Sequence, residues 1–148
     1  MHSQDVFRRS LKRVAAEIDP WLQQLTDVAS VERDWSGETW RVELEPRAAA
    51  ACPLEILLHG SNHADIAIAG ETFEGVDLGG LEALAPLIRA VTEGRVRHMS
   101  AVSAATGRPI GSKLVVDLGE GRQLTLGADL ADGMDVVRRE RHFAPYRR

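Results

Sequence analysis

The sequence is poor in cysteine and in long apolar runs, and each of these absences limits what the protein can be. Cys52 is the only cysteine, so the chain cannot form an internal disulfide, and we expect a buried structural thiol. No apolar run reaches the roughly 18 residues that a membrane-spanning helix needs. The arginines near the N-terminus precede an amphipathic stretch, whereas a secretory signal has a continuous apolar segment there. We therefore expect a cytoplasmic protein that does not enter a membrane.

The sequence also lacks the common catalytic and cofactor motifs. It contains no Gly-x-Gly-x-x-Gly, Cys-x-x-Cys, Gly-x-Ser-x-Gly or calcium-loop pattern. Residues 107–113 superficially suggest a phosphate-binding loop, but their order is Gly-Ser-Lys and a strand pattern follows where a P-loop opens a helix. These absences predict no cofactor and favour a non-enzymatic protein.

Length and composition are those of an ordinary globular domain. The 148 residues are 44% apolar and 27% charged, which allows a core without metal or disulfide staples. We expect one domain over residues 1–148 with a basic tail over about 138–148. Only two lysines stand against sixteen arginines, a bias that fits a GC-rich bacterial genome.

The N-terminal segment predicts an amphipathic helix that ends near Ala29. Its apolar residues recur in alternating steps of four and three. Asp19-Pro20 interrupts the pattern, so we expect either two helices or one helix kinked at Pro20. The stripe also matches a coiled-coil seam, but packing on the chain's own sheet is favoured because the stripe is short and contains a proline. The stripe residues are Phe7, Leu11, Val14, Ile18, Trp21, Leu25 and Val28.

Six strands and a second helix are predicted after this segment. The helix begins after Gly79-Gly80 and ends near Gly94, a C-terminal cap. Three strands precede it and three follow it, at residues 40–45, 54–58, 65–69, 96–103, 113–118 and 123–126. Short turns between the strands favour antiparallel pairing. The predicted fold class is α+β, a two-layer α/β sandwich with one antiparallel sheet of about six strands in two three-strand groups separated by the second helix.

Charge is strongly segregated along the chain. Residues 14–77 hold thirteen acids and three basic residues, a net charge of −10. Either the acids solvate the outer faces of strands and loops, or they form a surface that steers a basic protein partner. The candidate binding residues are Glu43, Glu45, Glu71, Glu74 and Trp35. The basic tail mixes arginines with two aromatics, but the acidic body argues against a nucleic-acid partner.

The best candidate for metal chemistry is His59-x-x-x-His63-x-Asp65. Two imidazoles and a carboxylate are the ligand types of a zinc or iron site. The segment is rich in turn formers, however, and polar turn histidines are commoner than ligands. The first histidine is also not followed by the glutamate of the zinc-protease motif.

Three functional hypotheses follow from these patterns. The first is a non-enzymatic binding domain that uses an acidic surface, such as an immunity-like or antitoxin-like inhibitor or a secretion-chaperone-like adaptor. The second is a small metal-dependent enzyme that uses His59, His63 and Asp65. The third is a homodimer that associates through the stripe of residues 7–28.

Overall fold

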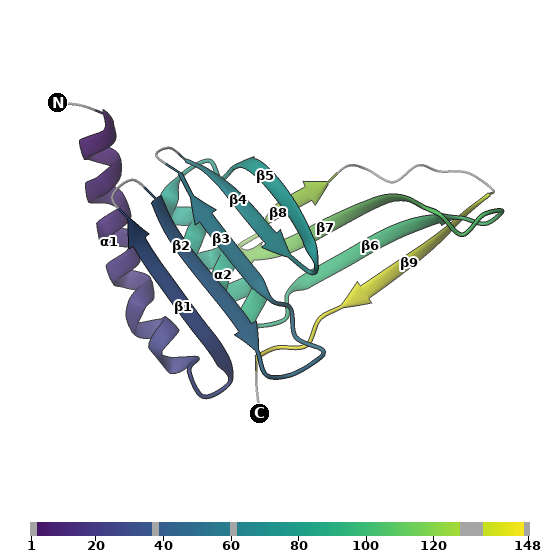
Figure 1. Cartoon of the computed structure of the whole chain (residues 1–148), viewed down its shortest axis with the longest axis horizontal. Helices are drawn as coiled ribbons and strands as arrows, with labels where there is room; N and C mark the ends of the chain where they lie inside the picture. The colour runs from purple at the N-terminus through teal and green to yellow at the C-terminus, as the bar shows by residue number, and fades with distance from the viewer. Residues whose placement is uncertain (1–2, 37–38, 60–61, 128–134, 147–148) are drawn as a thin grey trace.

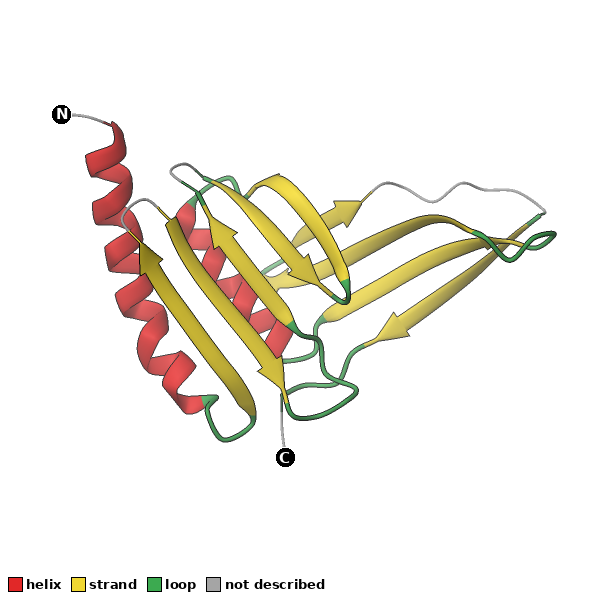
Figure 2. Ribbon diagram, in the orientation of Figure 1, coloured by secondary structure: helices red, strands yellow, loops and turns green. Residues whose placement is uncertain are grey.

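The computed structural model describes residues 3–36, 39–59, 62–127 and 135–146, and within them it is an α+β fold. The elements are α1 (Ser3–Gln24), β1 (Ala29–Ser36), β2 (Thr39–Pro46), β3 (Leu54–Leu58), β4 (His63–Ile68), β5 (Glu71–Asp77), the 3-10 turn η1 (Leu81–Ala83), α2 (Leu84–Thr92), β6 (Val96–Ser103), β7 (Pro109–Gly119), β8 (Arg122–Gly127) and β9 (Val136–His142). Figure 2 shows both helices on the same side of the strands β1 to β4. No helix in these residues is long and apolar enough to cross a membrane.

The strands form two antiparallel sheets, not one. The first has the order β1-β2-β3-β4-β5 and the second has the order β8-β7-β6-β9 (Figure 1). The expectation of a single sheet of about six strands is therefore wrong, although the two predicted groups are real. They are separated because α2 packs on β7 as well as on the first sheet, so the helix lies between the two sheets.

The sequence analysis did not predict three of the strands. They are β1, β5 and β9, and none of them carries a clean alternation of apolar and polar residues. The segment of β9 was expected to belong to a basic tail. It instead pairs with β6 along its whole length, from Val136 opposite Ser103 to His142 opposite Arg97.

Helix α1 runs through Pro20 as one helix and ends five residues before Ala29, where β1 begins. Its stripe is buried against the protein's own core rather than against another chain. Phe7, Trp21 and Val28 are half-buried at its margins. The buried members are Leu11, Val14, Ile18 and Leu25, and Leu22, which the predicted stripe did not include, is buried beside them. These side chains belong to the same buried cluster as residues of β2 and α2.

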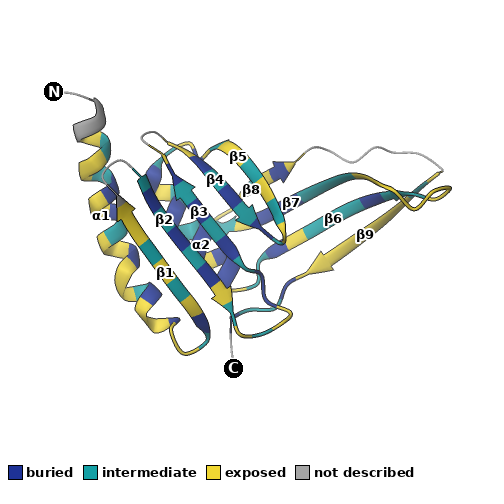
Figure 3. Ribbon diagram, in the orientation of Figure 1, coloured by how far each residue is buried: buried dark blue, intermediate teal, exposed yellow. Residues whose placement is uncertain are grey.

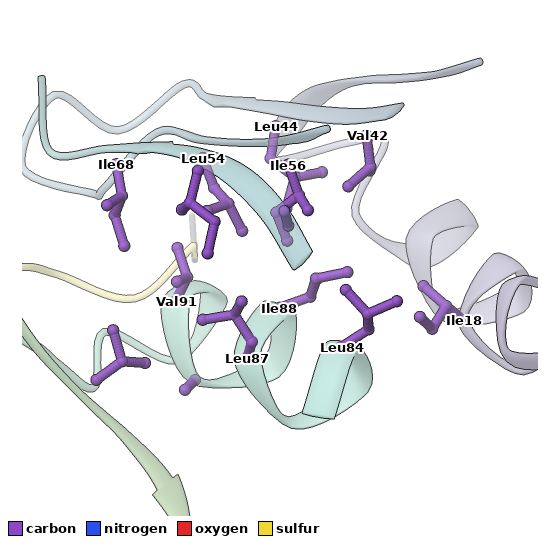
Figure 4. Close-up of a cluster of buried hydrophobic side chains, with 14 of the residues drawn as sticks. Ile18, Val42, Leu44, Leu54, Ile56, Ile68, Leu84, Leu87, Ile88 and Val91 are labelled. Atoms are coloured by element: carbon purple, nitrogen blue, oxygen red, sulfur yellow. The ribbon is translucent and has the colours of Figure 1, made fainter. Parts of the chain in front are cut away.

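The core lies between the first sheet and the two helices. Alternate residues of β2, β3 and β4 are buried, as period-two strands with one covered face require. Figure 4 shows these side chains meeting the apolar face of α2, with Ile18 of α1 closing one end. The contacting residues are Val42, Leu44, Leu54, Ile56, Ile68, Leu84, Leu87, Ile88 and Val91.

Gly94 ends α2, as the sequence predicts. Its φ is +77°, and the Arg95 amide donates to the Ala90 carbonyl while the Gly94 amide donates to the Val91 carbonyl. This pair of bonds is the Schellman arrangement, which satisfies carbonyls left free at a helix end.

The segment after β9 returns to the body. The Ala144 amide donates to the Ala50 carbonyl, and the Tyr146 amide donates to the Thr92 carbonyl. Phe143 is buried with Tyr146, so neither aromatic ring is available to stack on a nucleotide base.

The outer parts of β6, β7 and β9 project from the body as a ribbon (Figure 1). We call residues 97–113 and 136–142 the arm. None of them belongs to the buried core cluster, and Ala101 is their only buried residue. Figure 3 shows the arm as mostly exposed and half-buried. Its base meets the first sheet, where Ser112 and His98 lie against Glu71 of β5.

Candidate binding surface on the five-stranded sheet

The face of the first sheet that turns away from the helices carries a cluster of acids. Strand pairing sets Glu32 opposite Glu43, and Glu43 opposite Glu55, so the three carboxylates form a row across β1, β2 and β3. Paired residues point to the same face, and alternation points the neighbouring buried residues to the other. We call Glu32, Asp34, Glu43, Glu45, Glu55 and Asp65 the acidic face.

Arg41 is the only arginine or lysine among the outward-facing residues of β1 to β4 in the described ranges. Its guanidinium donates to Glu43 and lies 3.4 Å from Glu55 and 4.0 Å from Glu32. Its pKa is raised, chiefly by the hydrogen bond to Glu55; desolvation opposes this rise, and the charges of Glu55 and Glu43 add to it. Arg41 thus holds the row together while leaving the face strongly negative.

The arrangement of the row has a cost. Like charges directly opposite each other on neighbouring strands destabilise a sheet, and Glu32, Glu43 and Glu55 are placed this way. One arginine offsets only part of the repulsion among six acids.

Of the predicted binding residues, Glu43 and Glu45 lie on this face, and Glu71 does not. Glu71 stands opposite the buried Ile68 and points toward the second sheet. The Ser112 hydroxyl donates to its Oε1 at 2.5 Å, and His98 Nε2 lies 3.2 Å from its Oε2. Glu71 therefore links β5 to the second sheet.

Glu74 is exposed on β5, the edge strand, beside the bulge between β4 and β5. The sequence interpretation did not select Glu32, Asp34 or Glu55 as binding residues. Only the register of the strands reveals that they share a face with Glu43.

Two of the three tryptophans, Trp35 and Trp40, lie opposite each other on β1 and β2, and one is exposed while the other is buried. Trp40 is 4% exposed and belongs to the core, while its partner across the β1–β2 pair, Trp35, is 40% exposed. Their pairing places Trp35 on the helix side of the sheet, where a shallow hollow between α1 and β1 contains both rings. Trp35 therefore lies apart from the acidic face.

The structure brings two of the three predicted metal ligands together. His59 Nε2 lies 2.8 Å from Asp65 Oδ2, and Asp65 Oδ1 accepts the Gly75 amide at 2.9 Å. These two hydrogen bonds, that of His59 first, lower the pKa of Asp65. His63 lies opposite Asp77 at the start of β4. The described residues contain no group of three or more His, Cys, Asp or Glu that could hold a metal ion.

Cys52 has a structural environment. It is completely buried, and burial raises its pKa to about 11, so the thiol is held neutral. The Tyr146 hydroxyl donates to the Cys52 carbonyl, and burial raises the pKa of this tyrosine as well. This contact joins the C-terminal segment to the body.

Comparisons with known proteins give this chain no relative. No protein-family model, no curated protein and no solved structure matches it.

Proposed function

We propose that the protein is a non-enzymatic binding domain whose acidic face binds a basic protein partner. The observation that carries the proposal is the register of β1, β2 and β3, which gathers acids from separate strands on one face that no described element covers. An immunity-like or antitoxin-like inhibitor, or a secretion-chaperone-like adaptor, would use such a face to cover a basic surface of its partner.

The composition of the face suits protein binding. One-signed charge steers an oppositely charged partner and accelerates the encounter. Leu57 and Ala67 lie on the same face as the acids and are half-buried, so they supply apolar area among the charges. Interfaces combine such an apolar centre with a polar rim.

Glu71, Ser112 and His98 bring together a carboxylate, a hydroxyl and an imidazole, but not in the order of a catalytic triad. Glu71 contacts both Ser112 and His98, so the carboxylate is the central group. In an acyl-transfer triad the imidazole is central, because it must take the proton from the nucleophile. The cluster thus supports a structural role at the junction of the two sheets.

The test is a pull-down from lysate with three forms of the protein. The face variant replaces Glu32, Glu43 and Glu45 by Gln. The matched control replaces three exposed acids elsewhere, Glu17, Glu82 and Glu120, by Gln, so both variants lose the same charge.

We expect the wild type and the control to retain the same basic protein and to release it at moderate salt. The face variant should bind it at least about tenfold more weakly, with a flatter dependence on salt. Equal retention by all three forms, or equal loss from both variants, would contradict the proposal.

A further inference from the structure

Beyond its base at His98 and Ser112, the arm has no second layer among the residues that the structure describes. Domains bury a sheet face against another element, and three strands alone are stable only with an apolar face that is covered. The arm contributes no residue to the core cluster, yet it exposes Ile110 by 48% and Val137 by 44%. These are two of the four large apolar side chains that are exposed in the described ranges.

The arm is basic, whereas the first sheet is acidic. Its residues include six arginines and lysines and one acid, Glu140, for a net charge of +5. The register sets Arg139 on the side of Ser100 and Arg138 on the side of Ala101, so cations lie on both faces of the ribbon. The basic residues are Arg97, Arg108, Lys113, Arg138, Arg139 and Arg141.

We infer that the occupant of the acidic face is the arm of a second copy of this chain. The inference rests on the proposed function, because the docking surface is the same. It takes the basic partner to be the basic arm of another copy, in a chain whose overall net charge is −4. In the described part of the chain, no element covers the negative sheet face or the outer part of the positive ribbon, and each could supply the layer that the other lacks. In Figure 1 the arm extends sideways past the sheet. We expect a twofold dimer in which each arm lies across the other copy's acidic face, because dimers of identical chains are most often twofold.

The twofold arrangement has a testable signature, since it contains two identical junctions. The face reversal variant carries Glu32→Lys and Glu45→Lys, and the arm reversal variant carries Arg138→Glu and Arg139→Glu. Each variant alone opposes like charges at both junctions. An equimolar mixture restores opposite charges at both.

Sedimentation of the full chain at about 100 µM, in about 0.05 M and about 0.5 M salt, measures the effect. We expect the wild type to be dimeric at low salt and to dissociate at high salt. Each reversal variant should raise the dimer dissociation constant at least about tenfold, and mixing them should restore dimers. The neutral variants E32Q/E45Q and R138Q/R139Q should weaken the dimer by a smaller factor, and circular dichroism checks that all forms fold.

Three results would overturn the inference. The first is a wild type that is monomeric at both salt concentrations. The second is a dimer that forms equally well in both reversal variants. The third is an equimolar mixture of the two reversal variants that does not form dimers. A monomer whose arm binds a labelled DNA duplex would assign the arm to nucleic acid instead. If the chain is monomeric but the face variant of the pull-down still loses its basic protein, only this inference fails. If the face variants still dimerise and still retain the captured protein, the proposed function fails too.

Discussion

The two sheets differ in charge and in what covers them. The strands of the first sheet carry nine acids and two arginines, a net charge of −7, whereas those of the second carry six basic residues and two acids, a net charge of +4. The first sheet buries one face under α1 and α2, so its charge is confined to the other face. The arm buries neither face, so its cations lie on both sides. Whether helices cover one face of a sheet thus decides whether its charged side chains lie on one face or on both.

The largest effect should come from the core that the first sheet shares with α2. Ile88 is fully buried in that core, so Ile88→Ala should lower the free energy of unfolding by about 2–5 kcal/mol through lost burial and the cavity it leaves. Urea denaturation followed by circular dichroism measures the change. A loss below about 1 kcal/mol would mean that the body is packed as loosely as the arm.

A second contrast compares glycines of the body and the arm. A Cβ on Gly94 would lie 2.7 Å from the Phe143 carbonyl oxygen and 2.8 Å from the Pro145 nitrogen, whereas a Cβ on Gly107 would meet nothing within 4 Å. Both residues have positive φ, so each alanine substitution costs about 1 kcal/mol in backbone strain.

Gly94→Ala must in addition displace the docked C-terminal segment. We therefore expect its cost to exceed that of Gly107→Ala by about 1–2 kcal/mol. Denaturant midpoints of the two variants give the difference. Equal midpoints would show that this segment is held weakly.

We expect the free energy of unfolding to fall in alkali, because Cys52 is buried where the C-terminal segment meets the body. The pKa of Cys52 is about 11 in the folded chain against 9.0 for a free thiol. The unfolded chain therefore loses this proton first, and stability that is complete below pH 9 falls as the pH rises toward 11. The fall should reach about 2 kcal/mol near pH 10.5.

Cys52→Ala is the control, since it removes the titrating group. Between pH 8 and pH 10.5, the unfolding free energy of the wild type should fall more steeply with pH than that of Cys52→Ala. Parallel curves would show that the thiol of Cys52 does not contribute.

The smallest effect should come from the arm. Val137→Ala removes an exposed side chain, so we expect a change within about 0.5 kcal/mol in the monomer. Hydrogen exchange should show the amides of the arm opening at lower free energy than those of α2. Slow exchange in the arm of a monomeric sample would contradict the contrast between the two sheets.

The sequence predicts the elements that have a covered face and misses those without one. The structure confirms the alternation of β2 and β3, the stripe of α1 and the cap at Gly94. Each of these patterns arises because the element packs against the core. In β9 neither face is buried, so no apolar period exists to be found. In β1 an inward Arg33, paired with Asp19 of α1, breaks the period, and in β5 the bulge near Gly75 does so.

The acidic face was only partly predictable for a related reason. Alternation along one strand is enough to set Glu43 and Glu45 on the outer side. Bringing Glu32 and Glu55 beside them requires the register between strands, which depends on loops and on the core. Glu71, in contrast, was predicted as a binding residue but does not lie on this face. It belongs to a strand pair with a bulge and points inward to Ser112 of the second sheet.

The order of the strands also has a consequence for how the chain folds. In the first sheet every strand pairs with its successor in the chain, so each new hairpin closes a short loop. In the second, β9 must reach β6 across β7 and β8, a much more distant closure. We expect the first sheet to form early and β9 to join last. Until it does, β6 has an unpaired edge, and the time that β9 takes to arrive sets how long that edge can recruit other chains.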